Sequence, residues 1–276
     1  MESHLFSTIS ALKNKKRILF LTTSNRWKDE HGGEQPKSTQ LAHHLAQIVG
    51  KEKVTLIDIP SLNIFPCEGN VSTARGNTCG LKDALLADKE KNPSGNHRCW
   101  ASINNPSDEL WKVSKALLMS EAVVFFTSVR WGQTNSMYQK LIERLTWLEN
   151  RHSTLKEDNI LGHIDAGIIV TGHNWRGKEV LETEKEVLSY FGFQVKDQLC
   201  WNWQYLQDSS NESNEEYVKD NEIFKEIYLN EDKVGQNFFY RVSLHQSKGV
   251  VVVIRYILST SRHLYFILSH LKLGLV

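Results

Sequence analysis

A polar segment rich in hydroxyl groups, TTSNRWKDEHGGEQPKST, follows the apolar run at residues 18–21 and leads into a helical pattern. Ser and Thr hydroxyls, together with the free N–H groups of a helix N-terminus, favour the binding of an anion. The segment contains no GxGxxG, GKS or GKT, so it matches neither a dinucleotide fingerprint nor a triphosphate loop. We predict a monophosphate site built from Thr23, Ser24, Arg26, Ser38 and Thr39. The alternative is an ordinary polar loop in which Ser38 caps the helix.

A second candidate loop, at residues 127–135, combines a tryptophan, a glycine and small polar groups. The glycine would let a flat ring lie against the backbone, whose amides could bond ring nitrogens and carbonyls. Trp131 and Arg130 could flank such a ring by stacking or by a cation–π contact. The candidate residues are Ser128, Val129, Arg130, Trp131, Gly132 and Gln133. In the alternative, Trp131 packs against a neighbouring loop.

A third loop with ligand-binding character follows the next apolar run, and its candidates are Thr171, Gly172, His173 and Asn174. His173 is either a hydrogen-bond donor to a bound ring or an ordinary surface histidine. Because the carboxyl ends of parallel strands meet at one edge of a sheet, the three loops are expected to converge there. That convergence indicates a ligand site more strongly than any one of the loops.

The elements that position these loops alternate between strands and helices. Apolar runs predict five strands, at residues 18–21, 54–57, 122–126, 164–170 and 194–201. Helical spacing of apolar residues predicts helices at 38–49, 110–118, 136–147 and 177–190, and a shorter one near 223–228. The pattern predicts right-handed βαβ units and a flavodoxin-like, doubly wound α/β fold. Its parallel sheet would have five strands in the order 2-1-3-4-5, with helices on both faces.

The same pattern divides the chain into a central domain with two additions. We expect an N-terminal extension at residues 1–14, the flavodoxin-like α/β domain at 15–230 and a C-terminal extension at 231–276. Residues 60–106 are rich in Asn, Gly, Ser and Lys and show only a brief helical pattern at 81–88. So long an irregular stretch is typical of a functional segment, and we expect it to cover the site.

Composition narrows the classes of partner. The net charge is +1 and 24% of the residues are charged, which gives no electrostatic reason to expect nucleic acid or an anionic membrane surface as a partner. The first 14 residues lack the basic region and apolar run of a signal peptide, so we expect a cytoplasmic protein. Basic residues interrupt the apolar tail at 249–276, which favours a packed element or an appended tail over a membrane span.

The chain has four cysteines, Cys67, Cys79, Cys99 and Cys200. They are too sparse for a disulfide scaffold, and we expect reduced thiols rather than metal ligands or disulfides. We therefore predict no metal site.

The stretch SVRWGQTNSMYQKLIERLTWLENRH resembles the NADPH-dependent FMN reductase family of the flavodoxin-like superfamily. Ser128 to Gly132 is similar to that family's Thr-Pro-hydrophobic-Tyr-Trp-Gly loop, and Glu143-Arg144 to its Asp-Arg helix end. Ile57-Asp58-Ile59 with Ile64 to Cys67 resembles its second strand and exit, and Thr171-Gly172 with Gly177 to Glu179 its fourth-strand loop and helix. The resemblance covers about residues 15 to 205.

Two departures from that family bear on the site. Its iron–sulfur members carry a tight run of cysteines after the second strand, whereas Cys67 is followed by Glu68, Gly69 and Asn70. A cluster needs about four thiolates, so we expect none here. Arg130 replaces the usual Tyr, which makes Trp131 the expected stacking partner.

The resemblance implies an enzyme in which bound FMN takes a hydride from NAD(P)H and passes electrons to a quinone, a flavin or another small acceptor. The cofactor carries that chemistry and the protein supplies position and electrostatics, so no acid–base residue is named. A homodimer or homotetramer is expected. One alternative is an FMN electron carrier without its own NAD(P)H site, although the balanced charge disfavours it because flavodoxins tend to be acidic. The other is a protein on the same fold that has lost its cofactor.

Overall fold

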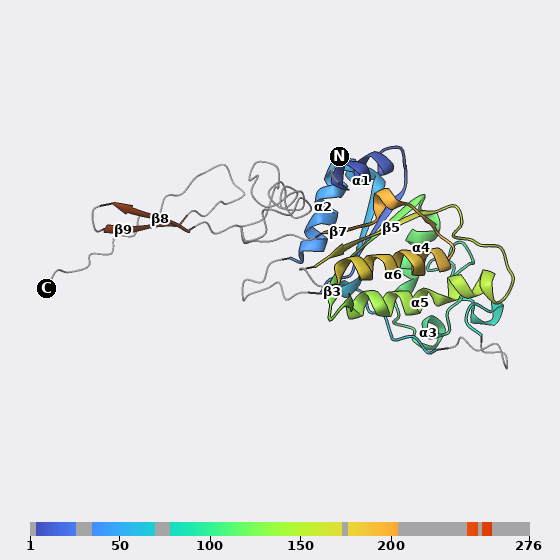
Figure 1. Ribbon diagram of the computed structural model, residues 1–276. Helices are drawn as coiled ribbons and strands as arrows, with labels where there is room; N and C mark the ends of the chain where they lie inside the picture. The colour runs from blue at the N-terminus through green and yellow to red at the C-terminus, as the bar shows by residue number, and fades with distance from the viewer. Residues whose placement is uncertain are drawn as a thin grey trace. The chain divides into compact units, whose positions relative to one another are not determined.

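The computed structural model describes residues 4–25, 35–69, 78–172 and 176–203, together with the backbone of 242–247 and 250–255. The chain divides into two compact units, Met1–Ile227 and Tyr228–Val276. The first unit contains the parallel sheet and its helices (Figure 1).

A parallel sheet with five strand positions forms the centre of the first unit. Its order is β2 (Val54–Asp58), β1 (Ile18–Thr22), β3 (Ala122–Arg130), β5 (Asp165–Thr171) and then β6 (Gln194–Val195). β7 (Trp201–Trp203) continues the last position by pairing parallel to β5. In terms of main strands this is the order 2-1-3-4-5, so the predicted flavodoxin-like topology is confirmed.

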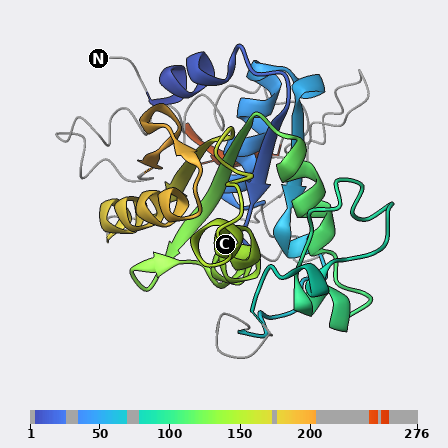
Figure 2. The ribbon, with the colours of Figure 1, turned by 90° about the vertical axis from the view of Figure 1, so that its right-hand side faces the viewer.

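Helices cover both faces of this sheet (Figures 1 and 2). α2 (Lys37–Val49) packs on β1, β2 and β3, and α1 (His4–Leu12) lies beside α2. α4 (Leu110–Met119), α5 (Ser136–Ser153) and α6 (Gly177–Tyr190) cover the opposite face, where their apolar stripes join one buried cluster with the sheet. The four helices that were predicted to begin at residues 38, 110, 136 and 177 are therefore present.

Both faces of the central strands are buried, which explains why these strands appear in the sequence as continuous apolar runs. All five residues of β1 are buried. Leu19, Leu21 and Phe125 face the cluster formed with α4, α5 and α6. Phe20 and Phe126 pack edge to face with ring centroids 5.0 Å apart.

The fifth strand differs from the continuous strand predicted at 194–201. A 3-10 turn, η4 (Asp197–Leu199), separates β6 from β7. Leu199 lies directly over Gly167 of β5, and a Cβ built on that glycine would be 2.1 Å from the Leu199 Cβ. The absence of a side chain at position 167 lets the turn approach the sheet, which is a long-range packing effect.

Residues 4–12, within the segment set apart as an extension, form α1 and pack on the last strand position. The Thr8 hydroxyl donates to the Gln198 carbonyl at 2.7 Å and accepts from the Trp201 indole N–H at 3.0 Å. The His4 ring stacks on Trp201 with centroids 5.5 Å apart. The N-terminal helix is thus joined to the sheet by contacts about 190 residues away in sequence.

The described part of residues 60–106 packs against α5 between Arg144 and Arg151. It contains the 3-10 turn η3 (Lys82–Ala84), where a brief helix was predicted, and the short helix α3 (Trp100–Asn104). Two further 3-10 turns, η1 (Lys51–Lys53) and η2 (Ile59–Ser61), flank β2. The Asn150 amide donates to the Cys79 carbonyl, and Arg151 bonds the Asn96 carbonyl at 3.3 Å.

In the second unit, β8 (Val242–Ser247) and β9 (Val250–Arg255) pair as an antiparallel hairpin. The other residues of the predicted C-terminal extension, and the helix predicted near 223–228, lie outside the described residues. Among the residues that the structure describes, no helix has the length and apolar character needed to cross a membrane.

Candidate functional site at the carboxyl edge of the sheet

The ends of β1, β3 and β5 meet at one edge of the sheet, which is the convergence predicted for the three loops. Thr22 of β1 is in register with Phe126 of β3, and Ser128 of β3 with Thr171 of β5. The Thr23 N–H extends this pairing by donating to the Phe126 carbonyl at 3.0 Å. The structure therefore brings the beginnings of the three loops to one edge of the sheet.

Asn135, which caps α5, connects the tips of β1 and β3. Its side-chain oxygen accepts from the Tyr138 N–H at 3.1 Å. Its amide nitrogen lies 3.1 Å from Thr23 Oγ1, 3.0 Å from Thr127 Oγ1 and 3.2 Å from Ser128 Oγ. One buried amide thus fixes three hydroxyls at the edge. Asn135 and Thr127 were not among the predicted binding residues, although an Asn directly before a helical pattern is a typical N-cap.

The hydroxyls of the first loop form a buried group at the N-terminus of α2. Thr23, Ser24, Ser38 and Thr39 are all buried. Ser38 does not cap the helix, because Pro36 is the N-cap residue and the Ser38 hydroxyl donates to Ser24 Oγ at 2.7 Å. The backbone N–H groups of the first turn have no partner within the helix, as at any helix start.

Among the described residues of this edge, two threonine hydroxyls are buried and have no hydrogen-bond partner. They are Thr39 Oγ1 in the first loop and Thr171 Oγ1 at the end of β5. Leaving a hydroxyl buried and unbonded costs about 1–3 kcal/mol. Each of them fits a ligand that brings a hydrogen-bond acceptor or donor to that point.

The loop after β3 is a hairpin rather than an open loop. β3 runs on to Arg130, and β4 (Gln133–Thr134) turns back and pairs with it. The two turn residues, Trp131 and Gly132, have φ of 51° and 73°, which matches the two-residue turns with positive φ at both positions. A tryptophan rarely adopts this conformation, and strained backbone of this kind is concentrated at functional sites.

The hairpin presents Trp131 to solvent. Its side chain is 91% exposed, so the alternative in which it packs against a neighbouring loop is wrong. Gly172 supports the other side of the hairpin, because a Cβ at this position would be 2.8 Å from Val129 Cγ2. Val129 and Gly172 therefore contribute packing, and Trp131 offers a free ring.

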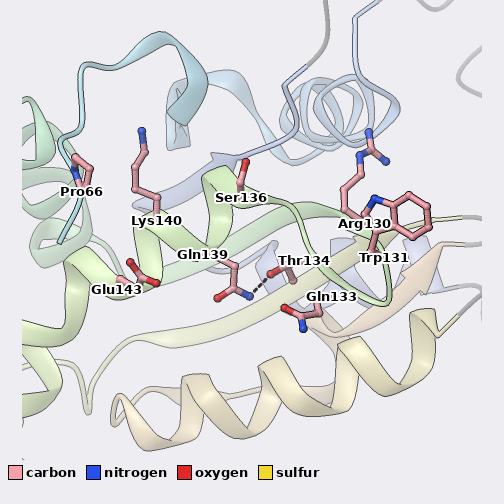
Figure 3. A pocket seen from close by; sticks show the side chains of 9 residues that line it. All are labelled: Pro66, Arg130, Trp131, Gln133, Thr134, Ser136, Gln139, Lys140 and Glu143. Carbon is pink, nitrogen blue, oxygen red and sulfur yellow. Dashed lines mark hydrogen bonds between the residues drawn. The ribbon is translucent and has the colours of Figure 1, made fainter. Parts of the chain in front are cut away.

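Two clefts flank the hairpin. The larger, of about 600 Å³, runs along the first turns of α5 (Figure 3) and is lined by Pro66, Arg130, Trp131, Gln133, Thr134, Ser136, Gln139, Lys140 and Glu143. The smaller, of about 270 Å³, lies between the hairpin and α6 and shares Trp131, Gln133 and Gln139 with the larger one. Of the described residues in the irregular segment 60–106, Pro66 alone lines either cleft.

A buried carboxyl group lies at the smaller cleft. Burial raises the pKa of Glu184 on α6, and the side chains of Tyr138, Thr134 and Gln139 surround it. Burial also raises the pKa of Tyr138 well above its usual value. Sequence patterns did not indicate Glu184, because a Glu on an amphipathic helix ordinarily faces water.

Three predicted binding residues, Arg26, His173 and Asn174, lie outside the described residues. The four cysteines are free thiols. Burial raises the pKa of Cys79 to about 12 and that of Cys200 to about 11, which keeps both protonated and unreactive near neutral pH. Within the described parts of the chain, no group of three His, Cys, Asp or Glu side chains is arranged to hold a metal ion.

Comparison with known proteins gives structural matches alone. No protein-family model and no curated protein matches the chain. RosB, solved with a bound 8-demethyl-8-formylriboflavin-5'-phosphate intermediate, has a TM-score of 0.45 and 11% identity over 94% of this chain and 99% of its own. FerB, a flavoenzyme NAD(P)H:(acceptor) oxidoreductase from Paracoccus denitrificans, has a TM-score of 0.42 and 12% identity over 77% and 91%. An azoreductase from Bacillus anthracis has a TM-score of 0.43 and 12% identity over 77% and 96%. Membership of the NADPH-dependent FMN reductase family stays a prediction.

Proposed function

We propose that the chain is an FMN-dependent NAD(P)H oxidoreductase and that FMN binds at the carboxyl edge of the sheet. The observation that carries the proposal is the pair of buried, unbonded hydroxyls, Thr39 Oγ1 and Thr171 Oγ1, in two of the three loops that converge there. Ligands of doubly wound sheets bind outside the carboxyl ends of the strands, where the strand order reverses. In this sheet that point lies between β1 and β3.

The first loop supplies the phosphate end of the site. Ser24, Ser38 and Thr39 lie at the start of α2, where hydroxyl groups and free backbone N–H groups favour one phosphate. Arg26 is proposed to add a positive charge. The absence of a glycine-rich fingerprint favours a mononucleotide over a dinucleotide.

The β3–β4 hairpin and the end of β5 supply the ring end. The backbone amide of Gly132, in the turn of the hairpin, would meet the polar edge of the ring, and Trp131 offers an exposed indole for stacking. Thr171 is proposed to bond a polar ring atom, and His173 and Asn174 are proposed to complete this end. FMN bound there supplies the redox chemistry by accepting a hydride from NAD(P)H and passing electrons to a small acceptor.

Steady-state oxidation of NADPH and NADH by the full chain loaded with FMN tests this function. We expect turnover with a quinone acceptor that rises in proportion to the fraction of chain loaded with FMN. If FMN binds but neither nucleotide is oxidised, the chain is an electron carrier and the enzyme proposal is wrong. If the purified chain does not bind FMN, it is a protein that has kept the fold and lost the cofactor.

A further inference from the structure

The larger cleft contains two positive charges that form no ion pair with a carboxylate among the described residues. The Arg130 guanidinium donates to its own neighbour, the Val129 carbonyl, at 3.1 Å. Lys140 lies one turn into α5 and is half-buried. In Figure 3 both side chains point upward. Arg130 lies at the end of the cleft beside Trp131, and Lys140 lies toward the end where Pro66 and Glu143 are.

The cleft has further features that suit an anion. It opens at the N-terminal turn of the 18-residue helix α5, whose partial positive charge adds to that of the two side chains. Of the residues that line the cleft, Arg130 and Lys140 against Glu143 leave a formal excess of one positive charge.

The same cleft has a face for a flat ring. Trp131 lines it with an indole that is 91% exposed, next to Arg130, and the volume of about 600 Å³ is in the range of small-molecule sites. Because the cleft shares Arg130, Trp131 and Gln133 with the ring end of the proposed FMN site, a molecule bound in it would lie beside the flavin.

We infer that this cleft binds the electron acceptor and that the acceptor is a flat aromatic compound carrying a sulfonate or carboxylate group. That the bound compound is an electron acceptor rests on the proposed function. The preference for an anionic ring depends on the residues of the cleft alone. For a quinone of this class, NAD(P)H, one proton from solvent and the quinone give NAD(P)⁺ and the hydroquinone.

The preference for an anion can be measured by equilibrium binding without turnover. The probes are a naphthalene sulfonate and the matching uncharged naphthalene sulfonamide, titrated against the full chain with and without FMN. We expect the sulfonate to bind about 3- to 10-fold more tightly at low salt, since each exposed charge pair contributes little by itself. Added salt should reduce this ratio. Equal affinities, or no binding of either probe, would overturn the inference.

Variants assign the preference to the two side chains. In the double variant Arg130→Gln with Lys140→Gln, the sulfonate-to-sulfonamide ratio should fall to about one. Trp131→Leu should weaken both probes and leave the ratio unchanged, because it removes stacking and no charge. The control is Lys51→Gln, an exposed lysine just before β2 at the amino edge of the sheet. A ratio that survives the double variant contradicts the inference.

A kinetic comparison separates acceptor from donor. With FMN bound, the double variant should raise KM for a naphthoquinone sulfonate about 3- to 10-fold more than KM for the unsubstituted naphthoquinone. If instead KM for NADPH rises and the preference between quinones is unchanged, the cleft binds the donor and the inference is wrong. Failure of the chain to bind FMN would reject the proposed function, whereas the probe titration on FMN-free chain still tests the anionic preference.

Discussion

Replacing Arg144 by Met is expected to lower the free energy of unfolding by about 3–5 kcal/mol, because it leaves a carboxylate buried without its partner. Arg144 and Asp108 are both fully buried and their charged groups are 2.9 Å apart. The guanidinium also donates to the Phe65 carbonyl at 2.7 Å and to Ser102 Oγ at 2.9 Å. The Arg144 side chain of α5 thus bonds three residues of the segment that follows β2, namely Phe65, Ser102 and Asp108.

Urea unfolding of matched variants measures this effect. Arg17→Met is the control, since Arg17 pairs with Glu121 at 3.0 Å but is largely exposed, and its loss should cost about 0–1 kcal/mol. Adding Asp108→Asn to Arg144→Met should recover part of the loss by removing the uncompensated charge. If Arg144→Met lowers the free energy of unfolding no more than Arg17→Met does, the Arg144–Asp108 pair does not stabilise the fold as expected.

Lowering the pH from 7 to 4 is expected to reduce the free energy of unfolding by about 3 kcal/mol through His97 alone. Burial, with a smaller contribution from the Arg144 charge, lowers the pKa of His97 from 6.5 to about 3. The ring lies between Ser114 Oγ at 2.8 Å and Ser102 Oγ at 2.9 Å, and it packs on Trp147. Between pH 3 and 6.5 the unfolded chain therefore binds a proton that the folded chain does not. The stabilisation is complete above about pH 6.5 and is lost as the pH falls toward 3.

Thermal and urea unfolding between pH 4 and 7 measure this dependence. His97→Gln should be less stable than the natural chain at pH 7 but should lose about 3 kcal/mol less on acidification. His163→Gln, at an exposed histidine, should keep the natural slope. Carboxylates whose pKa the fold lowers, such as Glu157 between Arg98 and Arg151, contribute equally to all three proteins. Identical slopes for His97→Gln and the natural chain would contradict the assignment.

The parts of the fold that local patterns determine were predictable. β1 is an apolar run because it is buried on both faces, and α6 has the predicted bounds of 177 and 190 because its apolar stripe has a clear start and stop. The break between β6 and β7 was not predictable, since it depends on Leu199 meeting Gly167 across the sheet. α1 was not predicted, because the burial of its residues Leu5, Thr8 and Leu12 depends on packing against distant residues such as Trp201.

The sequence allowed the location of the candidate site to be predicted, but not the conformation of its loops. Loop composition proposed Thr23, Ser38, Thr39 and Thr171 as binding residues, which stays a prediction, and the topology brings the strand ends that carry them to one edge. The hairpin was not expected, because pairing of Gln133 with Arg130 requires positive φ at a tryptophan. The segment at 60–106 packs, in its described part, on α5 through Arg144 near the middle of the helix and through Asn150 and Arg151 near its end. Such long-range hydrogen bonds leave no periodic pattern in the sequence.

The measurement that tests the central claim most directly is an equilibrium titration of the full chain with FMN, FAD and riboflavin, followed by flavin absorbance and fluorescence. We expect saturable binding of one FMN per chain, with FAD and riboflavin weaker because the first loop holds a single terminal phosphate. Thr39→Val should weaken FMN about tenfold, as expected for one hydrogen bond to a charged group, and should leave riboflavin affinity unchanged. It should not lower the unfolding midpoint, since Thr39 Oγ1 is buried and unbonded in the structure. Thr55→Val, at an exposed position of β2, is the control. Absence of FMN binding, tighter binding of FAD, or equal loss of FMN and riboflavin in Thr39→Val would contradict the account.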